Sequence, residues 1–352
     1  MKNEYKFGLE ELESQILTLS EKKITELTIV DERVAKNKQL LLRLINLIEK
    51  HAQDVFVSFL VDASVIDREV AAAASRIFCS LEIPLECTEK GGKILFDRKF
   101  YANKSKILND AGIVFGFDIT YAVSAGDTLK SFMERLDFAV QQYPNHIDFP
   151  QTEVSYSDIK DRYIESIEPK VTGLFSANDI RYCRDVSFAC RTFYSNGRAV
   201  PWFLSVLKPL RIHPSSFFAD FAEWQRCNNC DYKSGFVPEN ENHKSIERMQ
   251  LLFLDEKYEE KHCHNLLTLV NDIVRLNGAM ARLAGENEKS TVETSYNPDD
   301  IFGPESFDIV SFSENVCMEQ CKVNIFLTAN FLITKFKGIC KTVRACAIED
   351  SI

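Results

Sequence analysis

The first 150 residues alternate between two hydrophobic patterns. Short runs rich in β-branched residues are separated by longer stretches in which apolar residues recur every three or four positions. The first pattern is typical of buried strands and the second of amphipathic helices. The predicted strands start near Glu26, Asp54, Ser80, Ile113 and His146.

The stretches between these strands have the apolar faces and end signals of helices. One face is formed by Leu41, Leu44, Ile45 and Ile48. Gly112 is placed to end a helix that begins near Phe100, and Thr128 is placed to cap the next one. Alternating strands and helices predict a parallel sheet with right-handed crossovers, which is either an open doubly wound sheet or a full or partial barrel.

The carboxyl ends of the predicted strands are rich in acidic residues. In parallel α/β folds, this edge of the sheet is where ligands bind. No Walker-type loop and no Gly-x-Gly-x-x-Gly motif is present, which argues against a nucleoside triphosphate and leaves a cationic or hydroxyl-bearing ligand open. Helix capping is the alternative role for each of these carboxylates. The acidic positions are Asp31, Glu32, Asp62, Glu82, Glu86, Asp118 and Asp127.

Four segments carry a resemblance to a known family. They are Ser80–Cys87 (SLEIPLEC), Lys106–Tyr121 (KILNDAGIVFGFDITY), Gly126–Ala139 (GDTLKSFMERLDFA) and Tyr143–Asp148 (YPNHID). In their order and spacing they resemble the barrel of the radical S-adenosylmethionine (radical SAM) superfamily, in its cobalamin-binding branch. The resemblance covers residues 7–150 and extends into the helical stretch 175–224. It implies a partial (β/α) barrel of radical SAM type with parallel strands.

Two departures from the family pattern affect the expected chemistry. The family's Cys-x-x-x-Cys-x-x-Cys triplet, which holds a four-iron cluster, does not occur in the sequence. Cys317 and Cys321 have the first spacing, but Asn324 stands at the third position. By the order of strands, the chain begins just after the place of the triplet, so the first strand and the cobalamin domain are missing as well. The family's Gly-x-Pro-Gly loop is replaced by residues 122–126.

The missing triplet sets the functional expectation. Reductive cleavage of S-adenosylmethionine needs the cluster, so an iron–sulfur cofactor is not expected from this chain alone. We therefore expect a binding or scaffold protein that is not catalytic alone. The alternative is the C-terminal portion of a split or mis-started cobalamin-dependent radical SAM enzyme, which is catalytic only if a partner chain supplies the cobalamin and cluster segments.

No catalytic residue is assigned from the sequence. If S-adenosylmethionine binds, the resemblance points to acidic positions and the loop after the fourth predicted strand. The candidate cofactor-binding residues are Asp31, Glu32, Glu82, Gly126 and Asp127.

The remaining sequence divides into two parts. Residues 151–285 read as a helical domain, and residues 286–352 as a small mixed α+β subdomain. The mixed part contains strand-like runs at Ile309–Phe312, Val323–Leu327 and Phe331–Phe336. Within the helical part, Trp202 and Trp224 are candidates to line a groove.

Cys227-Asn-Asn-Cys230 is the best metal-ligand spacing in the chain. Zinc needs further ligands, which the segment His262–His264 contains. A zinc-binding interaction module that uses Cys227 and Cys230 is therefore a third reading. Five other cysteines lie in apolar surroundings and are expected to be small buried hydrophobes: Cys79, Cys183, Cys190, Cys340 and Cys346.

Composition narrows the class of protein further. The chain has 352 residues, 45% of them hydrophobic, and a formal net charge of −10. That length suits two domains with real cores, and the negative charge argues against general nucleic-acid binding. No signal peptide or membrane-spanning stretch is evident. Eleven cysteines without export signals favour reduced thiols and a cytoplasmic protein.

Overall fold

In the computed structural model, the chain forms two compact units. The first unit comprises residues 1–120 and 348–352, and the second comprises residues 121–347. The structure describes residues 9–19, 22–90, 93–123, 126–150, 169–326, 332–337 and 339–344.

A five-stranded sheet with the order β1-β2-β3-β6-β7 is the centre of the α/β fold. The pairs β1–β2, β2–β3 and β3–β6 are parallel. The order follows the chain without a reversal, as in part of a (β/α) barrel and unlike a doubly wound sheet. All five predicted strands are confirmed. Their bounds are Glu26–Ile29 (β1), Phe56–Leu60 (β2), Cys79–Pro84 (β3), Val114–Asp118 (β6) and His146–Asp148 (β7).

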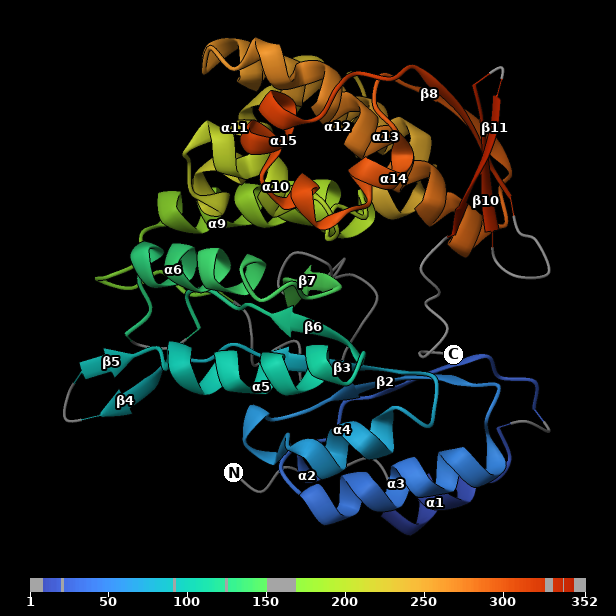
Figure 1. The fold of residues 1–352 in the computed structure, drawn as a ribbon. Coiled ribbons are helices and arrows are strands. Elements are labelled where there is room, and N and C mark those ends of the chain that lie inside the picture. Colours follow the sequence, from blue (N-terminus) through green and yellow to red (C-terminus); the bar gives the residue numbers. More distant parts are fainter. Residues whose placement is uncertain are drawn as a thin grey trace. The chain divides into compact units, whose positions relative to one another are not determined.

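Helices alternate with the strands in the first unit, and Figure 1 shows α1, α3 and α4 stacked side by side. The predicted apolar face of α3 is fully buried, which explains why this stretch is helical. Gly112 follows α5 with φ +66°, the left-handed conformation that ends a helix. The helices are Leu9–Ile16 (α1), Glu32–Ala35 (α2), Lys38–His51 (α3), Arg68–Ala74 (α4) and Arg98–Asp110 (α5), and a hairpin adds Thr88–Lys90 (β4) and Lys93–Leu95 (β5).

The second unit begins with α6, Leu129–Val140, which Thr128 caps as predicted through a reciprocal capping box with Ser131. This helix packs against α11 and α9. Phenylalanine rings from several helices form the core of the unit, with Phe193 at the centre of the cluster. The further helices are Ala177–Cys190 (α9), Phe203–Leu207 (α10), Pro214–Asn228 (α11), His243–Glu260 (α12) and Leu267–Glu286 (α13).

An antiparallel sheet of order β11-β10-β9-β8 forms the small C-terminal part. Two short helices, Pro298–Ile301 (α14) and Ile309–Asn315 (α15), lie between β8 and β9 in the chain. The strand predicted at Ile309–Phe312 is therefore wrong. Asp308 caps this segment as a helix and its apolar residues Ile309 and Phe312 are buried on one face. The strands are Ser290–Thr294 (β8), Cys321–Ile325 (β9), Leu332–Lys337 (β10) and Ile339–Arg344 (β11).

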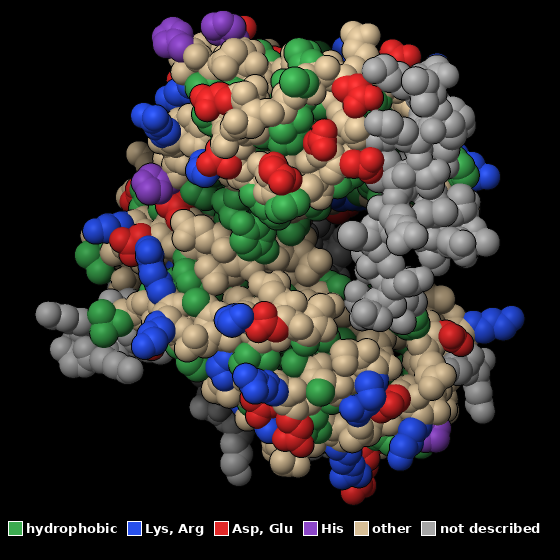
Figure 2. Space-filling view, in the orientation of Figure 1, with side chains coloured by type: hydrophobic (Ala, Val, Ile, Leu, Met, Phe, Trp, Pro, Cys, Tyr) green, Lys and Arg blue, Asp and Glu red, His purple; other side chains and the backbone are tan. Residues whose placement is uncertain are grey.

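The unit boundary near residue 120 precedes α6, whereas the sequence placed divisions at 150 and 285. The division into residues 1–150, 151–285 and 286–352 therefore remains a prediction. On the face drawn in Figure 2, acidic side chains are scattered over the region of α14 and α15. Within the described part of the chain, no helix combines the length and apolar character that crossing a membrane requires.

Candidate functional site

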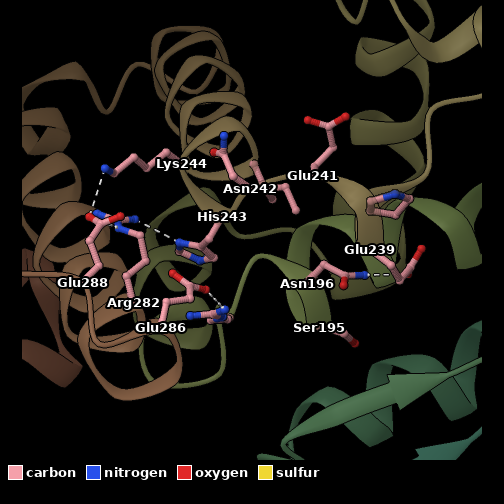
Figure 3. A pocket seen from close by; sticks show the side chains of 13 residues that line it. Ser195, Asn196, Glu239, Glu241, Asn242, His243, Lys244, Arg282, Glu286 and Glu288 are labelled. Carbon is pink, nitrogen blue, oxygen red and sulfur yellow. Dashed lines mark hydrogen bonds and ion pairs between the residues drawn. The ribbon is translucent and has the colours of Figure 1, made fainter.

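A cavity of about 720 Å³ lies within the second unit, and we call it the first cavity. Three parts of the chain form it: the turn after α9, the start of α12 and the end of α13 (Figure 3). Most of the residues that line it are polar, with Pro238 and Ile246 as apolar exceptions. The residues that carry the chemistry are Ser195, Asn196, Arg198, Glu239, Glu241, His243, Lys244, Arg282, Glu286 and Glu288.

The first wall is a π-helical turn, Arg191–Asn196, that continues α9. Such turns are rare and occur often at functional sites. The ring of Phe193 anchors this one in the aromatic core, while Ser195 and Asn196 line the cavity. Ser195 Oγ accepts a hydrogen bond from the Ile147 amide at 3.1 Å, which ties the turn to β7.

Gly197 allows α12 to approach this turn closely. Gln250 Nε2 donates to the carbonyl oxygens of Phe193 at 2.7 Å and Gly197 at 3.0 Å. A Cβ atom on Gly197 would lie 2.1 Å from both Gln250 Nε2 and the Phe193 oxygen. Only glycine fits at this position, because a real Cβ contact never becomes so short.

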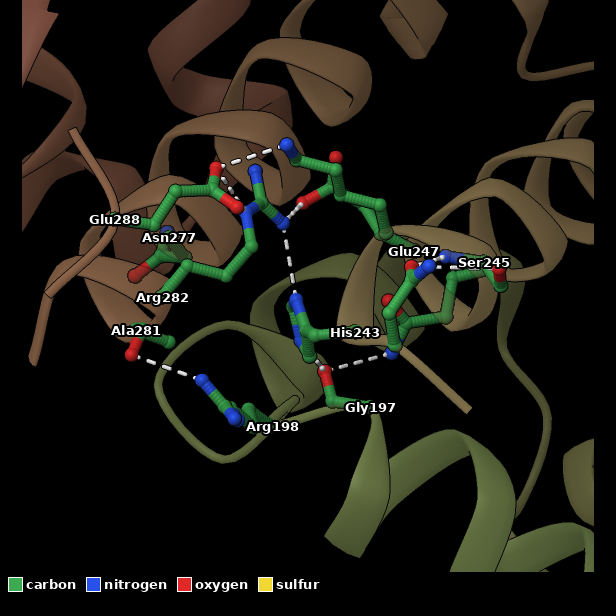
Figure 4. A network of polar contacts seen from close by, with 12 residues as sticks. Gly197, Arg198, His243, Ser245, Glu247, Asn277, Ala281, Arg282 and Glu288 are labelled. Atoms are coloured by element: carbon green, nitrogen blue, oxygen red, sulfur yellow. Dashed lines mark hydrogen bonds and ion pairs between the residues drawn. The ribbon is translucent and has the colours of Figure 1, made fainter. Parts of the chain in front are cut away.

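His243 is buried at the floor of the cavity, and its two ring nitrogens have different partners (Figure 4). Nε2 lies 3.3 Å from the Gly197 carbonyl oxygen, and Nδ1 lies 2.9 Å from Arg282 Nη1. A carbonyl only accepts and a guanidinium only donates, so Nε2 carries the proton and Nδ1 accepts. Burial lowers the pKa of His243 to about 4, and the charges of Arg198 and Arg282 act in the same direction. His243 is neutral at pH 7 and holds the wall together.

Arg282 lies on α13 and links this helix to α12, which begins at His243. Its guanidinium contacts Glu247 on α12 at 2.6 Å and Glu288 at 3.5 Å. Burial raises the pKa of Glu247, although Arg282 opposes that shift. Lys244 contacts Glu288 at 3.0 Å, and this hydrogen bond holds the pKa of Glu288 below its usual value.

The rim of the first cavity carries charges of both signs. On the α13 side, Arg198 pairs with Glu286 and donates to the Ala281 carbonyl oxygen at 2.8 Å. On the other side, Asn196 Nδ2 donates to Glu239 at 3.0 Å, and Glu241 lies nearby (Figure 3). The α13 side thus offers donors together with the carboxylates Glu286 and Glu288, and the other side offers mainly acceptors, which suits a small ligand with both kinds of group.

The three candidates in the first unit have local partners or lie in solvent. Asp31 caps α2 and contacts Arg33 Nη2 at 2.6 Å. Burial alone would raise the pKa of Asp31, but the hydrogen bonds and charge of Arg33 lower it. Glu32 is exposed and 3.5 Å from Lys36, while Glu82 accepts a hydrogen bond from Ser80 Oγ at 2.6 Å.

The other two cofactor candidates lie in the loop before α6. Asp127 is buried, accepts from the Val123 amide at 3.3 Å and contacts Arg135 Nη2 at 3.4 Å. Gly126 adjoins it in a turn. These contacts fix the loop, and whether any of the five candidates binds S-adenosylmethionine remains a prediction.

Cys227 and Cys230 lie at the end of α11, and both are exposed. Among the described residues, no group of three potential metal ligands includes either thiol. The zinc site therefore stays a prediction. Cys79, Cys183 and Cys190 are buried, as predicted. Cys346 lies outside the described residues, as does the side chain of Cys340.

The predicted groove around the two tryptophans is absent from the described structure. Trp202 and Trp224 are 3% and 8% exposed, and both pack into the aromatic core. No sequence pattern pointed to the first cavity, since its residues come from three segments that are distant in the sequence. Asn196-Gly197-Arg198 was the available signal, because glycine between polar residues marks a close backbone approach.

Comparisons with known proteins give little support for a family assignment. No protein-family model matches the sequence, and no curated protein matches it. One solved structure that is similar to part of this chain is the radical S-adenosylmethionine methyltransferase TsrM from Kitasatospora setae, with cobalamin and a 4Fe-4S cluster bound. The identity is 12% and the TM-score is 0.33, over 40% of this chain and 30% of that chain. A likeness this weak establishes neither a family nor a function for this chain.

Proposed function

We propose that this chain is a ligand-binding protein and that the first cavity binds a small zwitterionic molecule. The observation that carries the proposal is the facing arrangement of charges. Arg198, Arg282 and Lys244 lie on one wall together with Glu286 and Glu288, whereas Glu239 and Glu241 lie on the other (Figure 3). A ligand with one anionic and one cationic group finds a charge of opposite sign on each wall.

The geometry of His243 favours binding over catalysis at this site. Both ring nitrogens are engaged, one with Gly197 and one with Arg282. A general base needs a free nitrogen within reach of the substrate and a pKa near the working pH. The imidazole of His243 is neutral and both of its nitrogens have partners, which supports a structural role for His243 in the cavity wall.

The wider proposal is a radical SAM-like protein without its own iron–sulfur cluster. The absence of a Cys-x-x-x-Cys-x-x-Cys triplet from the sequence supports it. Burial raises the pKa of Cys79 to about 12 and also raises the pKa of Cys190, so these thiols are protonated at neutral pH. Iron ligation requires the thiolate. The nine cysteines whose side chains the structure describes are free thiols, which supports a cytoplasmic location as part of this proposal.

The split-enzyme alternative remains a proposal about a partner. In that case a second chain carries the cobalamin and cluster segments and makes this one catalytic. Co-expression with such a chain, followed by co-purification and a cluster absorbance assay, distinguishes the two. Anaerobic reconstitution of this chain alone with iron and sulfide is expected to give no stable cluster. A stoichiometric cluster on the purified chain would contradict the wider proposal.

Ligand binding is tested by thermal shift and calorimetry. The probes are the free amino acids and S-adenosylmethionine, since each combines an ammonium with a carboxylate. At least one is expected to raise the unfolding temperature of the wild type. Its N-acetylated, carboxyl-amidated form, which lacks both charges, should have no effect.

The matched variants are Glu241→Gln, which removes one of the two carboxylates on that wall of the first cavity, and Glu305→Gln, which neutralises an exposed acid elsewhere in the unit. Binding should weaken in the first and persist in the second. If no zwitterion stabilises the protein, or if both variants respond equally, the proposed function is wrong.

A further inference from the structure

Residues 297–320, which we call the acidic segment, lie between β8 and β9 in the second unit. They comprise α14, the short turn Pro304–Phe307, α15 and the chain that leads into β9. The two ends of the segment are held together. The Glu319 amide donates to the Ser295 carbonyl oxygen at 2.8 Å, and Asn297 Nδ2 donates to Glu319 at 3.0 Å. The segment is therefore a compact part of the fold with a defined outer side.

The inner side of the acidic segment already contributes to the core of the unit. Three of its apolar side chains are buried, namely Ile301, Ile309 and Phe312. Lys208 contacts Asp308 at 2.6 Å and ties the segment to the turn after α10. The segment is thus packed onto the unit without help from the apolar side chains on its outer side.

Four large apolar side chains remain exposed on the acidic segment. Their exposed fractions are 42% for Phe302, 60% for Phe307, 41% for Val310 and 62% for Met318. Both α14 and α15 pack against the turn Pro304–Phe307, so the first three of these side chains lie on neighbouring elements. Single exposed apolar residues are ordinary, but a group of them with a polar rim marks an interaction site. Phenylalanine and methionine are also enriched at protein interfaces.

The charged side chains of the acidic segment all have one sign. The segment contains no Lys, Arg or His, and its carboxylates are Asp299, Asp300, Glu305, Asp308, Glu314 and Glu319. Acidic side chains over this region are visible in Figure 2. Asp300, Glu305 and Glu314 are exposed, and none of the three forms an ion pair within the described part of the chain. Glu314 also lies in the last turn of α15, where the helix dipole disfavours a carboxylate. These charges do not stabilise the fold and surround its exposed apolar residues.

We propose that the outer side of the acidic segment is a docking surface for a cationic amphipathic helix of another protein. The apolar side of such a helix covers the four exposed apolar side chains, and its Lys and Arg side chains meet the carboxylates around them. Complementary charge selects this occupant. A second copy of this chain has a net charge of −10, and nucleic acids and anionic lipid headgroups are negative as well, so the segment repels all three. The surface is separate from the site of the proposed function, because no residue of the segment lines the first cavity.

The test measures binding of synthetic peptides to the full chain by fluorescence anisotropy. The probe is a labelled amphipathic helix of Leu and Lys with one Leu face. Two reference peptides each lack one property: the first has Glu in place of every Lys, and the second has the composition of the probe in an order that disperses the Leu residues. Only the probe is expected to bind, and its binding should weaken as sodium chloride rises from about 50 to about 300 mM.

Two variants of the acidic segment separate the apolar and the electrostatic parts of the interaction. Phe307→Ser is expected to weaken binding of the probe by about fivefold or more. Glu314→Gln should weaken binding at low salt and match the wild type at high salt. Leu252→Ser and Glu259→Gln are the matched controls, because both residues are exposed on α12, outside the segment. All four substitutions are at exposed positions, and circular dichroism checks the fold.

Hydrogen exchange of the complex locates the bound probe, and protection of residues 297–320 is expected. Equal binding of either reference peptide, equal weakening in the α12 controls, or protection only elsewhere would overturn the proposal. A dimer in analytical ultracentrifugation that Phe307→Ser dissociates would also overturn it, because the occupant would then be a second copy. Glu241→Gln alters the first cavity and should leave probe binding unchanged, so this inference and the proposed function fail separately.

Discussion

Substituting Gly197 by alanine tests how the first cavity is held in shape. The added methyl group would lie 2.1 Å from Gln250 Nε2 and 2.1 Å from the carbonyl oxygen of Phe193. The amide of Gln250 can rotate away, but the Phe193 oxygen belongs to the backbone of the π-helical turn. The backbone itself has to shift to relieve the second clash.

The magnitude follows from the contacts that such a shift disturbs. Overpacking of a tight site costs about 1–3 kcal/mol. The shift also lengthens the hydrogen bonds to the Gly197 carbonyl from Gln250 at 3.0 Å and His243 at 3.3 Å. Each buried bond contributes about 1 kcal/mol. We therefore expect Gly197→Ala to lower the free energy of unfolding by about 2–5 kcal/mol.

Gly173→Ala is the matched control, because no heavy atom lies within 4 Å of a Cβ at that position. Both substitutions restrict the unfolded chain in the same way, so the difference between them isolates the clash. Urea denaturation followed by circular dichroism measures both values. Equal stability of the two variants, within about 0.5 kcal/mol, refutes the reasoning.

Three further predictions concern other parts of the second unit. Burial raises the pKa of Asp272 to about 6, so folding favours the protonated carboxyl group. The stabilisation that this gives is complete below about pH 4 and is lost as the pH rises toward 6. Asp272→Asn should remove that loss, on the order of 3 kcal/mol, when urea midpoints of both proteins are compared from pH 4 to 7. Thr128→Ala removes the cap of α6 and should cost about 1 kcal/mol in thermal unfolding, and an unchanged midpoint would show that the cap is dispensable. If the zinc alternative is right, metal analysis should find about one zinc per chain in the wild type and none after Cys227 and Cys230 are replaced by serine. A wild-type protein that contains no zinc excludes this alternative.

The elements of the first unit were predictable because their signals are local. Strand positions follow from short β-branched runs, and α3 follows from an apolar face that is entirely buried. The hairpin Thr88–Leu95 was missed, since its strands are three residues long and alternate weakly. The segment Ile309–Phe312 has a strand-like composition, but capping by Asp308 makes it helical.

The first cavity was not predictable, because the residues that form it are distant in the sequence. His243 and Arg282 are thirty-nine positions apart and meet only when α12 packs on α13. The carboxylates that the sequence did select have local roles, as the capping by Asp31 illustrates. Periodicity reveals which face of a helix is buried, but not which polar side chains from two helices become partners.

Lys244 and Arg282 face the first cavity with their carboxylate partners already in place. An anionic group that enters this cavity has to compete with Glu288 for both cations. Any affinity measured there is therefore the free energy of an exchange of partners and not that of a newly formed ion pair.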